Sequence, residues 1–202
     1  MEEIKEALFD QGVLARNGAV KLAKPMSEVR LPPTVQGVLA SRIDRLGREQ
    51  KELLQTAAVI GKEFPLSLIR KVAGRPDDEL ERMLRELQLA EFIYEQPTVS
   101  DVEYTFKHAL TQEVAQGSVL SKRRMDLHRS IAAAIESLYD DRLEDHYGEL
   151  ARHYSRSGES AKAVEYLSLA GEQALARSAY AEAFAQLTTG LELLGVPVPE
   201  RM

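Results

Sequence analysis

The chain carries four histidines and no cysteine, so imidazole is its most versatile binding and proton-transfer group at neutral pH. His108 is the most informative of the four. It follows the strand-like run Val102–Phe106 and opens a helical pattern. Unpaired backbone N–H groups in the first turn of a helix attract anions. His108 is therefore the candidate to contact an anionic oxygen, the alternative being a histidine that caps or packs against its own hairpin.

The other histidines suggest weaker sites. His146, Glu149 and His153 share roughly one helix face, at spacings i, i+3 and i+7. A zinc site there would lack the His-Glu-x-x-His spacing and a third strong ligand, so a solvated or packing face is favoured. His128 lies in the basic run 122–129, which could contact phosphate but is more typical of a solvated helix face. We predict no metal site.

The residues of common catalytic sites are missing. None of the twelve glycines fits the phosphate loop G-x-x-x-x-G-K-[ST], and Gly61-Lys62 is followed by Glu63. Carboxylates such as Glu79 and Glu86 are spread along helix faces with no converging partner. The absence of cysteine excludes thiolate catalysis and Cys-ligated zinc or iron–sulfur within this sequence. We predict that the chain is not an enzyme and holds no cofactor by itself.

The composition is that of a core-forming, acidic protein. Among 202 residues, 44% are apolar and 29% charged, with 32 acidic against 26 basic side chains and a net charge of −6. This balance gives no reason to expect a nucleic-acid or membrane surface. No basic-then-apolar leader is visible, and no apolar run approaches the ~20 residues of a membrane span. The sequence predicts a cytoplasmic protein.

Two β-hairpins and a series of helices are expected to position these residues. Residues 92–95 and 102–106 flank a turn with Pro97 and Asp101, and 13–16 and 19–22 flank Asn17-Gly18. A helix is expected at 2–9, another from Pro33, and further helices ending near Gly61 and Gly74. Another spans Asp77 to Leu89, and Ser121 is the expected N-cap of a later one. Helices that end in a two-stranded ribbon are the plan of a winged helix.

The C-terminal third contains an internal repeat. Small and bulky residues fall at tetratricopeptide-like spacings, namely Leu150, Ala151, Tyr154, Gly158, Ala163, Leu167 and Ala170. A weaker copy follows at Gly171, Ala174, Ala183, Leu187 and Gly190. The copies are offset by 20 residues, so one long helix near 160–177 should serve both. The predicted fold is mainly α: a winged-helix domain with a small β-hairpin wing, then tetratricopeptide-like antiparallel helix hairpins.

Three segments also resemble a known family. Residues 31–46 (LPPTVQGVLASRIDRL), 55–64 (QTAAVIGKEF) and 106–110 (FKHAL) are similar to the region after the ATPase core in signal-transduction ATPases with numerous domains. The branch most resembled is bacterial, with an adenylate/guanylate cyclase domain before an AAA-like ATPase and a tetratricopeptide region. LuxR-type regulators share the middle part. The resemblance covers nearly the whole chain, although Gln116 stands where Tyr is expected.

The resemblance implies a division and a function. Residues 1–30 would be the tail of an ATPase lid (helix plus hairpin), 31–140 the winged-helix domain, and 141–202 the helical repeats. In such a family, the histidine matching His108 reaches the β-phosphate of ADP, which with ATP and Mg is held by an N-terminal ATPase domain absent from this chain. The chain would be either a fragment or the product of a truncated gene.

The expected role is a non-catalytic regulatory module of a cyclase-linked signalling ATPase, with a protein partner on the repeats. The alternative is the interaction and DNA-binding arm of a LuxR-type transcriptional regulator. Nucleic-acid binding is not expected, because the helix 77–89 that would enter DNA carries more acidic than basic residues.

Overall fold

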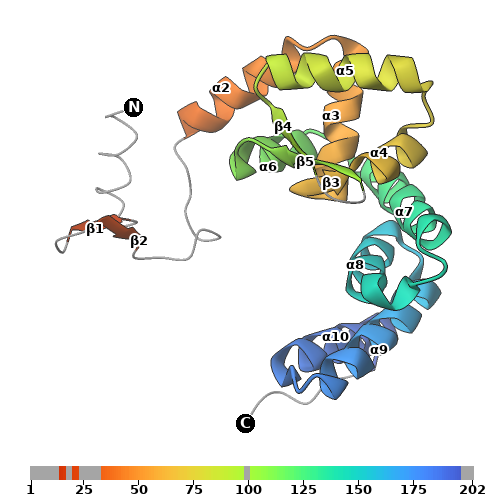
Figure 1. Cartoon of the computed structure of the whole chain (residues 1–202). Coiled ribbons are helices and arrows are strands. Elements are labelled where there is room, and N and C mark those ends of the chain that lie inside the picture. Colours follow the sequence, from red (N-terminus) through yellow and green to blue (C-terminus); the bar gives the residue numbers. More distant parts are fainter. Residues whose placement is uncertain (1–13, 17–19, 23–32, 98–100, 197–202) are drawn as a thin grey trace. The chain divides into compact units, whose positions relative to one another are not determined.

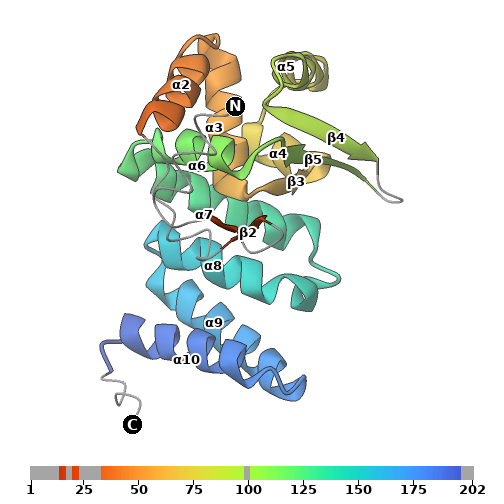
Figure 2. The same cartoon turned by 90° about the vertical axis from the view of Figure 1, so that its left-hand side faces the viewer.

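A computed structural model describes residues 14–16, 20–22, 33–97 and 101–196 of the chain (Figures 1 and 2). The fold is mainly helical, with a small three-stranded antiparallel sheet. The chain divides into two compact units, Met1–Leu46 and Gly47–Met202, which we describe separately. In the described residues, no helix combines the length and apolar character needed to cross a membrane.

The described residues of the first unit form a short hairpin and a helix. Strands β1 (Leu14–Arg16) and β2 (Val20–Leu22) pair antiparallel, with Leu14 opposite Leu22. Helix α2 (Pro33–Asp44) begins at a proline, whose fixed φ suits the first turn. The predicted hairpin and helix start are confirmed. The Asn17-Gly18 turn and the helix expected at 2–9 lie outside the described residues.

The second unit opens with helices around a sheet. Its first elements are α3 (Arg48–Ile60), β3 (Glu63–Pro65), α4 (Leu66–Ala73), α5 (Asp77–Leu89), β4 (Ile93–Pro97) and β5 (Val102–Phe106). The strand order is β3-β5-β4, with both pairs antiparallel. The predicted hairpin is confirmed as β4 and β5. Strand β3 was not predicted, because three residues are too few to show a strand period and their partner lies forty residues away.

The core of this region combines sheet aromatics with helix side chains. Phe64 on β3 stacks on Tyr104 of β5 at 5.7 Å between ring centroids, and Phe106 lies 6.0 Å from Phe64. Helix α5 turns Leu80, Met83, Leu84 and Leu87 inward, as its helical spacing requires. Gly74, with φ +58°, ends α4 in the left-handed region that suits glycine. The sheet therefore forms one side of a shared apolar core.

The rest of the unit is a run of helices, of which the last four α-helices each pack on the next one along the chain (Figure 2). They are α6 (Ala109–Gly117), α7 (Ser121–Leu138), a 3-10 helix η2 (Leu143–His146), α8 (Tyr147–Ser157), α9 (Ser160–Ala176) and α10 (Tyr180–Leu193). The long helix expected near 160–177 is confirmed as α9. The N-cap prediction at Ser121 is wrong by one residue, since Leu120 holds that position.

Small residues allow α8, α9 and α10 to approach closely. Of the first predicted repeat, Leu150, Ala151, Tyr154, Ala163, Leu167 and Ala170 are buried. Gly158 is exposed and ends α8. A Cβ on Gly171 of α9 would lie 2.7 Å from Leu187 of α10, so only glycine fits without a shift. The spacing that suggested helix hairpins thus marks the residues between these helices.

Candidate functional site

His108 lies at the junction between β5 and α6. It is the N-cap residue of α6, with extended backbone (φ −138°, ψ 133°), and its carbonyl accepts a hydrogen bond from the Thr111 N–H at 2.9 Å. Its imidazole is exposed and makes no capping hydrogen bond. The prediction that a strand delivers His108 to a helix start is confirmed. The alternative of a side-chain cap is wrong.

The backbone around His108 is held by the hairpin rather than by the histidine. The Phe106 N–H donates to the Lys62 carbonyl at 2.9 Å, and the Lys107 N–H donates to the Phe92 carbonyl at 3.0 Å. The Lys107 ammonium also pairs with Glu91 at 2.8 Å. These contacts fix where β5 ends, so His108 is presented to solvent from a supported position.

His146 and His153 belong to different environments. His146 precedes α8 in the 3-10 helix, stacks on Tyr139 at 4.0 Å, and lies 3.4 Å from Glu149. His153 is fully buried, against His128 of α7. Within the described ranges, no three His, Cys, Asp or Glu residues come together in a way that could hold a metal ion. The i, i+3, i+7 spacing therefore does not make a zinc site.

A hollow of about 630 Å³ lies beside His146, away from His108. Its polar lining mixes acidic residues of the sheet and α8 with Arg142 and Ser67. Asp101, at its rim, accepts hydrogen bonds from the Ser67 and Val102 backbone N–H groups. Asp101 is used by backbone N–H groups, and the His146 ring stacks on Tyr139 beside Glu149, so we assign the hollow no chemistry.

His128 of α7 and His153 of α8 form a buried pair. They are 2% and 0% exposed, and their Nδ1 atoms lie 2.9 Å apart. The prediction that His128 lies on a solvated face is wrong. The two residues are 25 positions apart in the chain, and a single sequence offers no local signal that they meet.

The surroundings of the pair determine where its protons lie. Arg152 Nη2 contacts His153 Nε2 at 2.9 Å and the Ile60 carbonyl at 2.8 Å. A guanidinium can only donate, so His153 Nε2 accepts and its ring proton sits on Nδ1. His153 Nδ1–H then donates to His128 Nδ1. His128 in turn carries its own proton on Nε2.

Both rings are neutral at pH 7. Burial, followed by the positive charges of Arg156, Arg152 and Arg124, lowers the pKa of His128 to about 4. Burial, followed by the charge of Arg152, lowers the pKa of His153 to about 2. The tautomers assigned above therefore persist across the physiological range.

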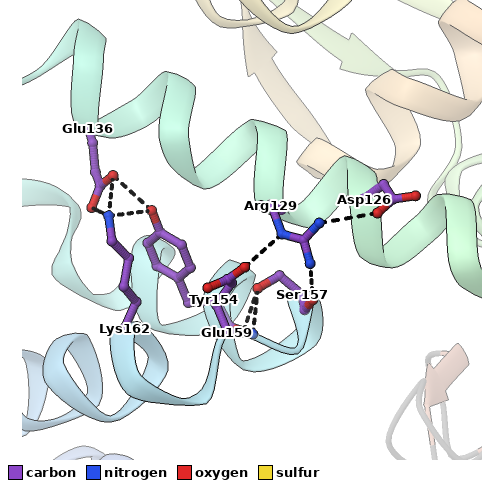
Figure 3. Close-up of polar contacts among 7 residues, drawn as sticks. All are labelled: Asp126, Arg129, Glu136, Tyr154, Ser157, Glu159 and Lys162. Carbon is purple, nitrogen blue, oxygen red and sulfur yellow. Dashed lines mark hydrogen bonds and ion pairs between the residues drawn. The ribbon is translucent and has the colours of Figure 1, made fainter.

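A half-buried carboxylate joins α7, α8 and α9 (Figure 3). Glu136 accepts bonds from the Lys162 ammonium at 2.7 Å, Tyr154 Oη at 2.8 Å and Tyr166 Oη at 2.6 Å. Burial alone would raise the pKa of Glu136, but hydrogen bonds from Lys162, Tyr166 and Tyr154 outweigh it and lower that pKa. Because Lys162 is itself held charged by Glu136, the cluster is a structural link between three helices.

A second cluster in Figure 3 centres on Arg129. Arg129 of α7 pairs with Glu159 at 2.9 Å and Asp126 at 3.4 Å, and it reaches the Ser157 carbonyl at 3.5 Å. The side chains of Arg129 and Glu159 are 50% and 45% exposed. Exposed pairs of this kind contribute little to stability.

The outer face of α5 is acidic. Its exposed residues are Asp77, Asp78, Glu81, Arg82, Arg85, Glu86 and Leu89. Asp77 pairs with Arg70 at 2.8 Å, and Arg85 lies 4.0 Å from Glu81. The face has no basic stripe to neutralise phosphates.

The chain is distantly similar to a bacterial protein. Over 163 residues the chain is 31% identical to an uncharacterized protein of Rhizobium meliloti (strain 1021). The match covers 79% of this chain and only 16% of that protein's length. A scan against models of protein families finds no match. The chain thus corresponds to a segment of a much longer relative.

Proposed function

We propose that the chain is a non-catalytic regulatory and interaction module of a multidomain signalling ATPase. In this proposal, the part around the sheet is a winged helix that closes over ADP bound by an N-terminal ATPase domain. The helix hairpins after it are tetratricopeptide-like and receive or relay the signal of a protein partner. The proposed parent belongs to the cyclase-linked branch that the sequence resembles.

The order of elements supports the winged-helix assignment. Helices α3, α4 and α5 precede a two-stranded ribbon, and the short strand β3 completes a three-stranded sheet. The close approach of α9 and α10 at Gly171 supports the repeat-like assignment of the following helices. The match to a relative about five times longer fits a module inside a multidomain protein.

One observation carries the proposal: His108 is exposed, at a fixed strand end, beside the first N–H groups of a helix. An imidazole beside a helix N-terminus is suited to an anionic oxygen. The β-phosphate of ADP is such a group, so His108 would sense which nucleotide the ATPase domain holds. In this chain alone, His108 would have no ligand to sense.

The test is ADP titration of the parent protein with and without His108→Ala at fixed pH. A charge-assisted hydrogen bond contributes roughly 1.5–3 kcal/mol, so its loss should weaken ADP binding by about tenfold to a hundredfold. The matched control is Glu113→Ala, an exposed substitution on the same helix. Equal dissociation constants for wild type and His108→Ala would leave His108 with no sensing role.

The same proposal makes a prediction for the isolated chain. It should bind no ADP measurably and hydrolyse no ATP, because the phosphate loop lies in another domain. Tight ADP binding, or turnover above a blank that survives repurification, would contradict this division of labour.

The alternative, a DNA-binding arm of a LuxR-type regulator, has less support. It would place α5 in the major groove, and the acidic outer face of α5 would repel the phosphates there.

A further inference from the structure

We propose that a hollow between α6, α7 and α8 binds the phosphate group of a small organic phosphate monoester. Its volume is about 440 Å³. The residues that line it are Gln116, Ser121, Arg124, Met125, His128 and Arg156. They come from the last turn of α6, the first two turns of α7 and the last turn of α8.

The charged residues of this lining are all positive. It holds two arginines and no carboxylate. In the described part of the chain, neither Arg124 nor Arg156 has an ion-pair partner, whereas neighbouring Arg129 pairs with Asp126 and Glu159. Two unpaired guanidinium groups facing one hollow favour a dianion, and their planar fork matches phosphate oxygens.

His128 adds a directed donor. Its Nδ1 accepts a hydrogen bond from His153, so its proton is on Nε2. No group in the ranges that the structure describes accepts a hydrogen bond from this Nε2–H. Among the described residues, Thr105 Oγ1 is the only side-chain polar atom that is both fully buried and without a partner. His128 Nε2–H is therefore reachable from the hollow that the ring lines. A ligand oxygen that accepts from His128 Nε2–H would extend the chain of hydrogen bonds that runs from Arg152 through His153 to His128.

The start of α7 also favours an anion in the hollow. Ser121 is the first residue of an 18-residue helix, and no side chain caps that end. The unpaired N–H groups of a first turn favour a negative charge. The hollow thus combines two cations, one buried imidazole N–H and a helix end.

The size of the hollow argues for more than an inorganic ion. Its volume exceeds the ~30 Å³ share of one water molecule many times over. Met125, 44% exposed, offers an adaptable apolar contact for the organic part. Since the chain has net charge −6, a nucleic acid would be repelled beyond this hollow.

This site is independent of the proposed nucleotide sensor. His108 precedes the first turn of α6, whereas Gln116 lies in the last turn of that helix. Failure of either proposal would leave the other in place.

The test follows the imidazole ¹H–¹⁵N signals of the 202-residue chain by NMR at pH 7.5, during titration with phenyl phosphate and with inorganic phosphate. The His128 Nε2–H signal should shift saturably, more tightly with phenyl phosphate, and the His108 signal should not. Arg124→Gln and Arg156→Gln should each weaken binding by about tenfold or more. The matched control is Lys122→Gln, which removes the same charge from an exposed neighbour outside the lining.

Several results would overturn the proposal. No saturable His128 shift below about 10 mM phenyl phosphate would exclude a site of useful affinity. Equal weakening by Lys122→Gln would reduce the effect to general screening. A shift of the His108 signal without a shift of the His128 signal would show that the anion binds at the β5–α6 junction instead. Tighter competition by a phosphopeptide or an oligonucleotide would overturn the small-molecule assignment.

Discussion

The end of the β-hairpin and the packed helices α7–α10 use polar side chains in opposite ways. At the hairpin end, backbone hydrogen bonds and an exposed ion pair hold the chain, and His108 remains in solvent. Between the helices, histidines and a glutamate are buried or half-buried and bonded to each other, to arginine or to lysine. The first arrangement leaves a group for an external ligand, whereas the second uses such groups to align helices.

This difference separates a residue that is available for ligand binding from residues that stabilise the fold. A supported but unpartnered side chain can change without disturbing the fold, while a buried polar network cannot lose a member cheaply. The four predictions below test this contrast, from the largest expected effect to the smallest.

Acid should destabilise the chain through the buried histidine pair. The pKa values of His128 and His153, about 4 and about 2 in the folded state, lie below the unfolded value of 6.5. The unfolded state therefore binds more protons below pH 6.5, so stability falls as pH falls toward the folded pKa. Between pH 7 and pH 5, each histidine that stays neutral in the folded state should lower the free energy of unfolding by about 2 kcal/mol. Urea unfolding at both pH values measures this.

The control for the acid effect is the exposed histidine. His108→Gln should keep the same loss between pH 7 and pH 5, whereas His128→Gln should reduce it. An unchanged free energy of unfolding in the wild-type chain between these pH values would show that the pair is not held neutral.

Glu136→Gln should lower the free energy of unfolding by about 1–2 kcal/mol, because Lys162 loses its charged partner and two tyrosines lose a strong acceptor. The matched change Glu159→Gln, in the exposed cluster of Figure 3, should cost less than about 0.5 kcal/mol. Chemical denaturation of both variants provides the measurement. Equal costs would mean that the half-buried cluster stabilises no more than a surface pair.

Two glycine substitutions should have opposite signs. Gly171→Ala places a Cβ 2.7 Å from Leu187 and should cost about 1 kcal/mol by overpacking. Gly190→Ala meets Leu167 at an ordinary 3.6 Å and should stabilise by about 0.5–1 kcal/mol, since alanine favours the helix. Thermal unfolding of the two variants gives the comparison. Stabilisation by Gly171→Ala would show that α9 and α10 do not need this close approach.

The smallest effect is expected at His108. In this chain, His108→Ala should change the free energy of unfolding by less than about 0.5 kcal/mol, because the imidazole is exposed and caps nothing. A larger loss in the same denaturation assay would mean that His108 supports the hairpin after all.

Local patterns predicted most of the elements. The ribbon of β4 and β5, the helix start at Pro33, the helix from Asp77 to Leu89 and the helix ends at Gly61 and Gly74 depend on residues within one or two turns of each other. Strand β3 could not be predicted in this way, because Phe64 becomes part of a strand only by pairing with Tyr104. The predicted position of His108 between a strand and a helix start is confirmed, because a strand end and a helix start are both local features.

The sequence by itself determined where helices and strands lie, which faces are apolar, and that a histidine stands between β5 and α6. Only the tertiary structure decided which polar groups meet. His128 joins His153 across 25 residues, and Arg152 joins the Ile60 carbonyl across 92. The physical reason is helical phase: each residue turns the helix by about 100°, so small shifts between packed helices change every partner. Such pairings are properties of the packed helices and not of any one segment.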